Sequence, residues 1–334
     1  MNQEIICGSV DVMKCNIIWN KLSLDEWQNR FASIKHSNIL QSYPYAQACA
    51  KTYGQKARWG LIMMGDKEAG LVQIIESSLL FGAVHGVILD RGPLWFDGYG
   101  GAAHIKLFFD EINKEFPRRV GRKRRVLPEI DMGGAIEQII RQCGFEKKPE
   151  IQAYQTIWWD LNEPDELARA GLKSNWRGSL KKSENAELEI KWEKLQESSV
   201  EAFTEFKLHY IQDKVSKGYT GISPKLLNNL ALFSTQANPM ILGKVKLDDE
   251  DIAGVLFLTH GQCATYQIGW SSDIGRLNCA HHLLLWRGRE ILKEHNIHTL
   301  DLGGINDHDD TQKGLSSFKR GIGGKEIELA GHYF

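Results

Sequence analysis

The sequence predicts an α+β protein built from two related lobes. The chain has 334 residues, which is long enough for two separate cores. Short apolar runs at 59–64, 69–76 and 83–90 are separated by polar or glycine-containing turns, which indicates three consecutive antiparallel strands. A similar order of elements returns in the second half of the chain. We therefore expect a strand meander, a helix and a further strand to occur twice.

In the first half, helical spacing follows the meander at 102–115. The segment RRVLPEI (124–130) then reads as a strand, and a helix is expected over 134–143 because Gly144 supplies a stop signal. These elements complete the first expected unit.

In the second half, apolar runs at 240–247, 252–260 and 263–270 form the second expected meander. Residues 278–296 carry apolar side chains at helical spacing and predict a helix with one buried face. The segment IHTLDLGG (297–304) then reads as a strand.

The two meanders can be aligned so that Gly70 and Gly254 occupy equivalent positions. The segment WWDLNEPDE (158–166) ends a strand in an acidic, proline-containing turn, so we place the boundary there. The expected lobes are residues 1–160 and 161–334, with the C-terminal segment packing back on the first lobe.

Composition and charge narrow the function classes. The formal net charge of −1 gives no overall attraction to nucleic acid or membrane, so an anion site has to come from local clusters. No apolar run approaches the ~20 residues of a membrane span, and the N-terminus does not read as a signal peptide. The six cysteines are scattered without a CxxC pair, which indicates reduced thiols in the cytoplasm.

Residues 173–190 form one cationic segment. On a helix, Arg177 and Lys181 lie four residues apart on one face, while Trp176 and Leu180 share another. This arrangement suits a phosphate or an RNA backbone. It is also typical of a solvated helix whose tryptophan lies in the core.

Residues 118–126 are the densest positive segment, with six basic residues in nine. They could follow a polyphosphate or a tRNA backbone. The last part also reads as an edge strand with charged outward side chains, so both interpretations stay open.

Imidazoles and carboxylates occur at 281–282 and in the loop 306–310. Adjacent histidines on a helix point about 100° apart, so we expect no metal site. Asp301 fits either a general base or a cap for the loop that follows it, and capping is the commoner role.

Residues 301–324 join a strand end to a glycine-rich turn. Gly303 and Gly304 let the backbone leave the strand sharply and approach a ligand with no Cβ in the way. Phe318 and Lys319 then place an aromatic ring and an ammonium at consecutive positions. Such an ammonium, held among apolar walls, can stabilise the oxyanion that forms when an amine attacks an ester. The alternative is a lysine that reaches solvent past a core phenylalanine.

Several segments resemble, in order, motifs of the Fem family of aminoacyl-tRNA-dependent transferases, which add amino acids to peptidoglycan precursors. They are ILQSYPYAQ (39–47), VLPEI (126–130), CGF (143–145), TIWWDL (156–161), NWRGSLKKSE (175–184), TLDLGGI (299–305) and FKRGIGG (318–324). The last two are the most specific. The resemblance covers nearly the whole chain.

The resemblance implies two acetyltransferase-like (GNAT-like) lobes with a cleft between them, each lobe a mixed, mainly antiparallel sheet flanked by helices. It implies transfer of an amino acid from aminoacyl-tRNA to an amine of a cell-wall peptide precursor or a related acceptor. No covalent enzyme intermediate is implied, and no cofactor besides the aminoacyl-tRNA co-substrate. Lys319 falls on the family's catalytic lysine with Phe318 beside the substrate, and Tyr266 falls on a substrate-contacting tyrosine.

Some positions depart from the family pattern. After the early aromatic, here Tyr45, related chains carry a phosphate-binding lysine, but Cys49 aligns with it and Lys51 lies two residues later. A further basic residue is Lys214 or Lys217, of which we assign Lys217. Similar double lobes occur in exopolysaccharide and natural-product pathways, so the acceptor is not fixed as peptidoglycan.

The hypothesis drawn from these residues is a tRNA-dependent aminoacyl transfer. We expect Lys319 to stabilise the developing negative charge, and Gly303, Gly304 and Phe318 to shape the pocket for the tRNA's terminal adenosine and amino acid. The remaining substrate-binding candidates are Tyr266, Arg177, Lys181, Lys217 and Asp301. The expected partners are aminoacyl-tRNA, the amine acceptor and the inner membrane surface, with no metal.

Two other functions remain open. An acyl-CoA-dependent N-acyltransferase of the same fold normally needs a glycine-rich loop whose N–H groups reach the pyrophosphate. The corresponding turn, residues 275–282, carries Asn278 and Cys279 in place of those glycines. A non-catalytic double-lobe binding protein is the third hypothesis, in which replacing Lys319 leaves activity unaltered.

Overall fold

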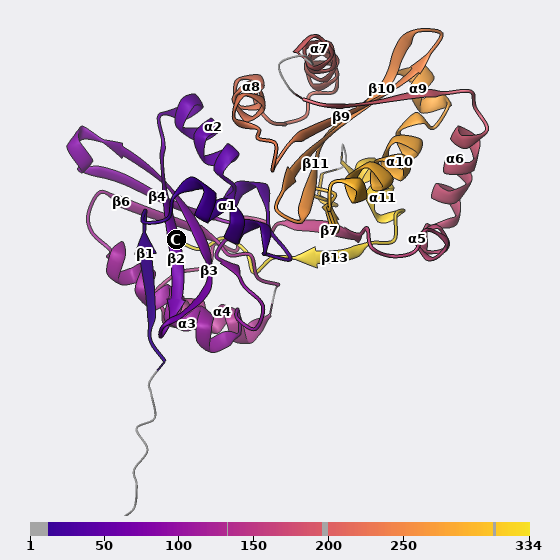
Figure 1. The fold of residues 1–334 in the computed structure, drawn as a ribbon. Coiled ribbons are helices and arrows are strands. Elements are labelled where there is room, and N and C mark those ends of the chain that lie inside the picture. Colours follow the sequence, from indigo (N-terminus) through magenta and orange to yellow (C-terminus); the bar gives the residue numbers. More distant parts are fainter. Residues whose placement is uncertain (1–12, 132, 196–199, 310–311) are drawn as a thin grey trace, which may run out of the picture.

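The computed structural model describes residues 13–131, 133–195, 200–309 and 312–334. The expected N-terminal part of the first lobe (residues 1–12, with Cys7) and Asp310 of the acidic loop lie outside these described residues. The chain forms two sheets, each with helices packed on it, and the two lobes lie next to each other (Figure 1).

The first sheet contains the expected first meander. Its strand order is β1 (Cys15–Trp19), β2 (Lys56–Met64), β3 (Lys67–Leu79), β4 (Val84–Asp90) and β6 (Arg122–Leu127), and the short β5 (Leu94–Trp95) pairs with β3. The pairs are antiparallel except for β4 and β6, which are parallel. The predicted antiparallel run of β2, β3 and β4 is confirmed.

Helices of the first lobe begin and end at recognisable signals. They are α1 (Leu24–Ala32), α2 (Tyr43–Tyr53), α3 (Ala102–Glu115) and α4 (Gly134–Gln142), with the 3₁₀ turns η1 (Ile39–Gln41) and η2 (Leu80–Gly82). A capping box between Ser23 and Glu26 starts α1, since each side chain binds the other residue's backbone N–H. The helices expected at 102–115 and 134–143 are confirmed as α3 and α4.

The second sheet contains the second meander. Its strand order is β13 (Lys325–Glu328), β7 (Gln155–Asp160), β12 (Thr299–Asp301), β11 (Cys263–Ser271), β10 (Glu250–His260), β9 (Met240–Leu247) and β8 (Glu189–Lys194). Only β11 and β12 among these neighbours are parallel. The expected fold class, two mixed and mainly antiparallel sheets flanked by helices, is confirmed.

Helices pack on the second sheet. They are α5 (Asp165–Gly171), α6 (Ser174–Glu184), α7 (Val200–Lys217), α8 (Pro224–Phe233), α9 (Asp273–Leu277), α10 (Ala280–Glu294) and α11 (Lys313–Arg320). The buried part of α10 is wider than the predicted single face, since it also includes Leu283, Leu285, Trp286 and Arg289. This central helix packs against α6, β9, β10 and β11.

The chain crosses between the lobes at both ends of the second lobe. The strand TIWWDL, expected to close the first lobe, is β7 and pairs with β12 and β13 in the second sheet. After β13 the C-terminal segment returns to the first lobe, where Tyr333 exchanges backbone hydrogen bonds with Val126 (2.8 and 2.9 Å). Tyr333 is fully buried in the first lobe's core.

The lobes also share an apolar contact. Helix α2 of the first lobe packs against α8 of the second, and the side-chain amide of Asn229 donates to the hydroxyl of Thr52 at 2.8 Å.

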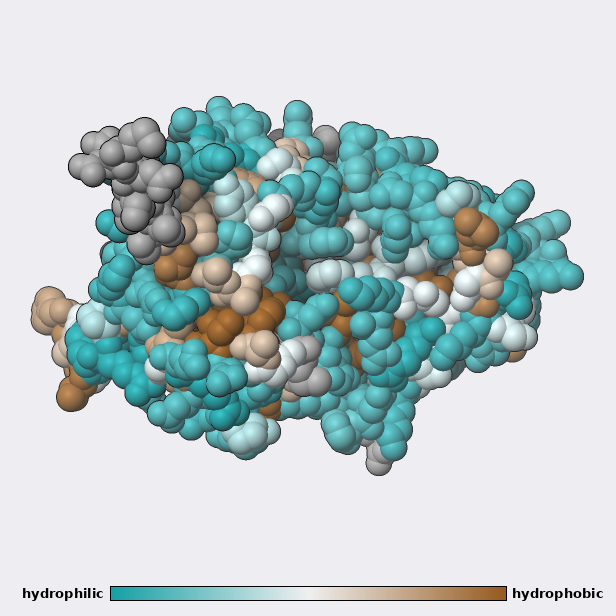
Figure 2. Space-filling model, turned by 90° about the horizontal axis from the view of Figure 1, so that it is seen from below, coloured by the Kyte–Doolittle hydropathy of each residue, from teal (hydrophilic) through white to brown (hydrophobic). Residues whose placement is uncertain are grey.

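Seen from below, the surface is mainly hydrophilic, with apolar side chains gathered over the first lobe on the left (Figure 2). In the described part of the chain, no helix is long and apolar enough to cross a membrane.

Candidate active site

Lys319 lies inside the protein. The residue is on α11 and is only 5% exposed. Its Nζ donates a hydrogen bond to the carbonyl oxygen of Gly304 at 2.7 Å and lies 5.7 Å from the centroid of the Tyr266 ring. An ammonium has three N–H donors. Within the described ranges Gly304 takes one of them, so two are left for an incoming oxygen.

Burial also changes the acidity of this side chain. Loss of solvation lowers the pKa of Lys319 to about 8, while the negative charge of Asp301 acts in the opposite direction. At neutral pH the group is still mainly an ammonium. Because water no longer solvates it fully, this cation would interact more strongly with an oxyanion than an exposed lysine does.

The turn after β12 brings the acceptor carbonyl to Lys319. Gly303 has a φ of 72°, in the left-handed region that favours glycine. A Cβ at this position would lie 3.2 Å from the Tyr266 carbonyl oxygen and 3.6 Å from Lys319 Nζ. Glycine therefore both permits the turn and leaves the space beside the ammonium free.

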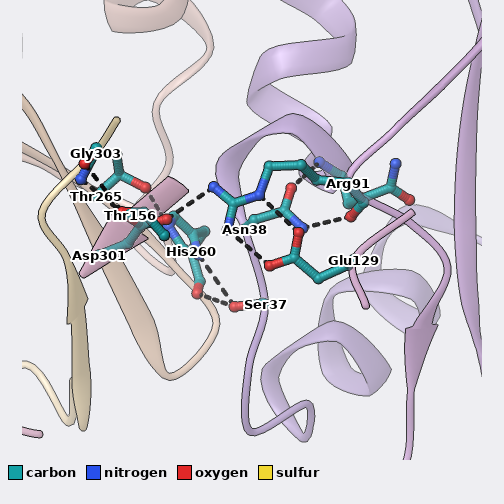
Figure 3. Close-up of polar contacts among 10 residues, drawn as sticks. Ser37, Asn38, Arg91, Glu129, Thr156, His260, Thr265, Asp301 and Gly303 are labelled. Carbon is teal, nitrogen blue, oxygen red and sulfur yellow. Dashed lines mark hydrogen bonds and ion pairs between the residues drawn. The ribbon is translucent and has the colours of Figure 1, made fainter. Parts of the chain in front are cut away.

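A buried ion-pair network between the lobes holds the start of this turn (Figure 3). Arg91, at the end of β4, donates from Nη1 to Asp301 at 2.8 Å and makes two hydrogen bonds to Glu129 at 2.6 and 2.7 Å. The three side chains are 5–7% exposed. Asn38 donates to the Arg91 carbonyl oxygen at 2.6 Å and fixes the arginine's own backbone.

Asp301 acts as a cap in this arrangement. Its Oδ1 accepts hydrogen bonds from the Gly303 N–H at 2.8 Å and from the Thr156 hydroxyl, while Oδ2 accepts from Arg91. Burial alone would raise the pKa of Asp301, but the Arg91 charge and these hydrogen bonds outweigh it and lower the pKa. Both oxygens are occupied by protein donors, so the geometry favours the capping interpretation over that of a base.

A second polar chain lies beside the first (Figure 3). The His260 ring joins the Ser37 hydroxyl at 3.1 Å and the Thr265 hydroxyl at 2.9 Å, and Ser37 donates to the His260 carbonyl oxygen at 2.6 Å. Burial lowers the pKa of His260 to about 3, so the ring is neutral. These hydrogen bonds tie the first lobe to β10 and β11 next to the candidate site.

An aromatic wall lies on the other side of Lys319. The Tyr266 hydroxyl and His281 Nε2 are 2.9 Å apart, and the Phe318 ring is 5.7 Å from the His281 ring and 4.9 Å from the His282 ring. Burial lowers the pKa of His281 to about 3 and that of His282 to about 4, so both are neutral. Trp176 closes the wall at 5.9 Å from Phe318.

The His281 ring bears on what the Tyr266 hydroxyl can do. His281 Nδ1 is buried, and within the described ranges it has no hydrogen-bond partner. The pair has two arrangements: the Tyr266 hydroxyl donates to Nε2 and Nδ1 carries the unpaired N–H, or Nε2–H donates to the Tyr266 oxygen. Only the second arrangement leaves the phenol hydrogen for an incoming acceptor.

The other substrate-binding candidates lie apart from this group. Arg177 donates to the carbonyl oxygens of Ala170 and Leu172, both at 3.1 Å, and so binds the end of α5. Lys181, which lies with Arg177 on α6, is exposed. Lys217 pairs with Asp213 at 2.6 Å on α7. The apolar face predicted for α6 is confirmed, because Trp176 and Leu180 are buried.

The positive segment 118–126 mostly binds the protein itself. Arg124 is buried, with its guanidinium 4.3 Å from the Phe145 ring centroid, and Arg125 pairs with Asp90 at 2.6 Å. Arg118, Arg119 and Arg122 donate to backbone carbonyl oxygens of neighbouring loops. The edge-strand interpretation is confirmed by β6, which ends the hydrogen-bonded order of the first sheet.

The positions that depart from the family pattern lie as follows. Cys49 is buried between the lobes, while Lys51 is exposed with its ammonium 5.9 Å from the Phe233 ring centroid. Lys214 donates to the Gly221 carbonyl oxygen at 3.1 Å.

Sequence reasoning missed the residues that hold the turn and the wall. Glu129 and Thr156 lie within the segments VLPEI and TIWWDL, which were used only as strand markers. Arg91 was not considered, although a charged residue directly after an apolar strand and before Gly-Pro is a usable signal. His281 was weighed only as a metal ligand, and the part of the chain that the structure describes contains no group of His, Cys, Asp or Glu arranged to hold a metal ion.

Comparisons with known proteins match one segment of this chain by sequence and nearly the whole chain by fold. The model of the FemAB family matches residues 224–334, which contain Tyr266, the 301–304 turn and Lys319. No curated protein sequence matches this chain.

Solved structures share the fold over nearly the whole chain. A crystal structure of FemX superposes with a TM-score of 0.78 at 15% identity, covering 95% of this chain and 96% of the other. A tandem GNAT protein from the clavulanic acid biosynthesis pathway gives 0.51 at 10% identity, with 96% and 98% covered. The C-terminal domain of a putative lysylphosphatidylglycerol synthetase from Agrobacterium fabrum gives 0.50 at 15% identity, with 80% and 84% covered.

These comparisons confirm the resemblance stated from the motifs and the two-lobe GNAT-like fold. Residues 224–334 of this protein therefore match the FemAB family model, and the whole chain shares its fold along nearly its full length with FemX.

Proposed function

We propose that this protein is an aminoacyltransferase that moves an amino acid from aminoacyl-tRNA to an amine of a cell-wall peptide precursor or a related acceptor. One observation carries the proposal. Lys319, in the segment FKRG of the FemAB-family match, is a buried ammonium beside a glycine turn and the Tyr266 ring, and among the described residues only the Gly304 carbonyl oxygen takes one of its three donors. This is the arrangement that a developing oxyanion requires.

The proposed chemistry is a direct substitution at the aminoacyl ester. The acceptor nitrogen attacks the ester carbonyl carbon, and a tetrahedral adduct with a negative oxygen forms. Lys319 donates to that oxygen, and we propose Tyr266 as a second donor in the arrangement in which His281 carries its proton on Nε2. The adduct collapses by cleavage of the bond between carbon and the tRNA's terminal ribose oxygen, which gives the amide and free tRNA.

Asp301 does not act as the general base in this proposal, because both of its oxygens accept hydrogen bonds from protein groups. The acceptor amine has to lose a proton, and the ribose oxygen that leaves has to gain one. We propose that the proton passes between these two substrate atoms, with Lys319 stabilising the charge while it does so.

The remaining assignments are proposals of the same kind. Gly303, Gly304 and Phe318 would shape the pocket for the terminal adenosine and its amino acid. Lys181 and Lys217 are exposed and would bind substrate phosphates. Arg177 donates mainly to carbonyl oxygens at the end of α5, so only its remaining N–H groups would bind a phosphate. We further propose a cytoplasmic location, contact with the inner membrane surface, and lobes divided near residue 160, with β7 crossing to the second sheet just before that point.

The experiment supplies the purified protein with aminoacyl-tRNAs labelled in the amino acid, together with peptidoglycan-precursor peptides and other amines. Labelled acceptor should form, and ribonuclease added before the reaction should abolish it. Acetyl-CoA supplied alone should give no product, since the turn at 275–282 presents Asn278 and Cys279 where a CoA loop needs bare glycines.

Two outcomes overturn the proposal. Transfer from acetyl-CoA without tRNA assigns the fold to an acyl-CoA N-acyltransferase. Absence of any transfer across the tRNA pool, with specific retention of a ligand, assigns it to a binding protein.

A further inference from the structure

The end of the first lobe farthest from the second carries exposed apolar side chains. The turn between β3 and β4 lies at this end, at the left of Figure 1, and apolar side chains project at the same edge in Figure 2. The residues concerned, called here the apolar tip, are Leu79, Leu80, Phe81, Val84 and Val120. Their exposed fractions are 68%, 74%, 115%, 47% and 98%.

Two separate segments make up this tip. Leu79 and Val84 are paired across the β3–β4 hairpin. The loop before β6 lies against that hairpin, because Arg119 donates to the Gly82 carbonyl oxygen at 2.8 Å and the His85 N–H donates to the Gly121 carbonyl oxygen at 2.8 Å. Val120 therefore projects beside the hairpin side chains and enlarges one continuous patch.

The backbone of the turn is strained. Leu80 and Phe81 have φ values of 50° and 54°, in the left-handed region that large side chains rarely adopt. Neither side chain gains burial in return. Strain of this kind persists at sites of recognition, where the surrounding structure holds the segment in place.

Cations surround the tip. Lys123 is exposed on β6, and Arg118, Arg119 and Arg122 lie on the adjoining loop and strand. Among the carboxylates of this region, Glu146 lies 3.9 Å from Arg118, and Glu76 lies 3.5 Å from Arg58. Glu115 likewise binds Arg58, at 2.6 Å. The patch thus combines apolar side chains at its apex with a positive rim.

We propose that the apolar tip inserts into the interfacial region of an anionic lipid bilayer, with the surrounding cations on the lipid headgroups. Aliphatic and phenylalanine side chains lose contact with water there, while basic side chains keep theirs and gain anionic partners. A nucleic acid offers no comparable partner for leucine and valine side chains, because base recognition uses stacking and hydrogen bonds. The inference rests on the proposed contact with the inner membrane surface and does not depend on the transfer reaction.

The test is sedimentation of the full chain with vesicles of phosphatidylcholine alone or mixed with phosphatidylglycerol. Binding should require the anionic lipid. The double variant Leu80→Ser, Phe81→Ser should lower the partition coefficient about tenfold or more, and Lys123→Glu should lower it roughly fivefold. Leu277→Ser and Lys225→Glu change equally exposed side chains elsewhere and should leave it unchanged.

The result that overturns the proposal is equal vesicle binding by the tip variant and the unaltered protein, or no binding by either. A tip variant that loses tRNA in a filter assay but keeps its vesicle binding would assign the patch to RNA. Circular dichroism confirms that each variant is folded. Transfer to a soluble acceptor should be the same with and without the tip, so this test and that of the proposed reaction fail independently.

Discussion

At the scale of single residues, the Lys319 ammonium is poorly solvated, and in the described ranges it donates one hydrogen bond, to the Gly304 carbonyl oxygen. Replacing it with Met keeps the length of the side chain and removes the ammonium. We expect kcat for aminoacyl transfer to fall about 100- to 1,000-fold, which is typical for loss of one oxyanion donor, with a smaller change in KM. Single-turnover transfer measures this effect. The control variant is Lys325→Met, which replaces an exposed lysine on β13. Its kcat should equal that of the unaltered protein.

The acidity of Lys319 sets an upper pH limit for the reaction. Its pKa is lowered from 10.5 to about 8 by burial. The ammonium that stabilises the oxyanion is therefore present below about pH 8 and is lost as the pH rises through that value. We expect kcat to decline above about pH 8, and Lys319→Arg to shift this decline upward because arginine stays charged. A kcat that keeps rising to pH 10 in the unaltered protein excludes this role.

Tyr266 offers a second donor whose hydrogen is free if His281 carries its proton on Nε2. Tyr266→Phe removes the hydroxyl and keeps the ring under Lys319. We expect kcat to fall about three- to tenfold, in keeping with one neutral hydrogen bond. The decline above about pH 8 should keep its position, since Lys319 is unchanged. An unaltered kcat assigns the hydroxyl to packing alone.

At the scale of elements, the turn 301–304 depends on a residue of the other lobe. Arg91→Met leaves Asp301 and Glu129 buried without their partner, and breaking a buried pair in this way costs about 3–5 kcal/mol of unfolding free energy. Denaturant titration of the variant measures it. The triple variant Arg91→Met, Glu129→Gln, Asp301→Asn removes all three charges and should recover much of that stability.

In the same variants, transfer activity distinguishes a loss of folding from a loss of positioning of the turn. The triple variant keeps the packing but loses the ion pair that holds the Gly303–Gly304 backbone. We expect it to remain folded with a kcat at least about tenfold below that of the unaltered protein, because small displacements of a catalytic group are costly. Full activity in the folded triple variant contradicts a positioning role for Arg91.

The elements differ in how far sequence could predict them. The strands of both meanders and α3, α4 and α10 follow from periodicity and stop signals, because each depends on local spacing of apolar residues. The strand β7 was assigned to the wrong sheet, since pairing partners far apart in sequence decide which sheet a strand joins. Its sequence neighbours lie in the first lobe, but its hydrogen-bond partners lie at 299–301 and 325–328.

The candidate site shows the same limit. The segment FKRG and the glycines at 303 and 304 were readable because their residue types are unusual for their positions. Arg91, Glu129 and Thr156, which belong to the network around Asp301, come from three distant segments of the chain. A buried charge network produces no periodic pattern in the local sequence from which it could be predicted. Burial of Lys319 likewise became visible only once α11 was placed against the turn.

At the scale of the whole molecule, the candidate site lies where the two lobes share one polar network. The apolar contact between α2 and α8 and the returning C-terminal segment hold the lobes together. The turn that carries the carbonyl partner of Lys319 therefore depends on both halves of the chain being docked, because Arg91 of the first lobe binds Asp301.

Single-turnover transfer from purified aminoacyl-tRNA to an amine acceptor, compared between the unaltered protein and Lys319→Met at pH 7, decides whether the buried ammonium promotes the reaction. We expect ribonuclease-sensitive product from the unaltered protein and a rate about 100- to 1,000-fold lower from the folded variant. An equal rate in the two proteins would contradict the proposed role of Lys319.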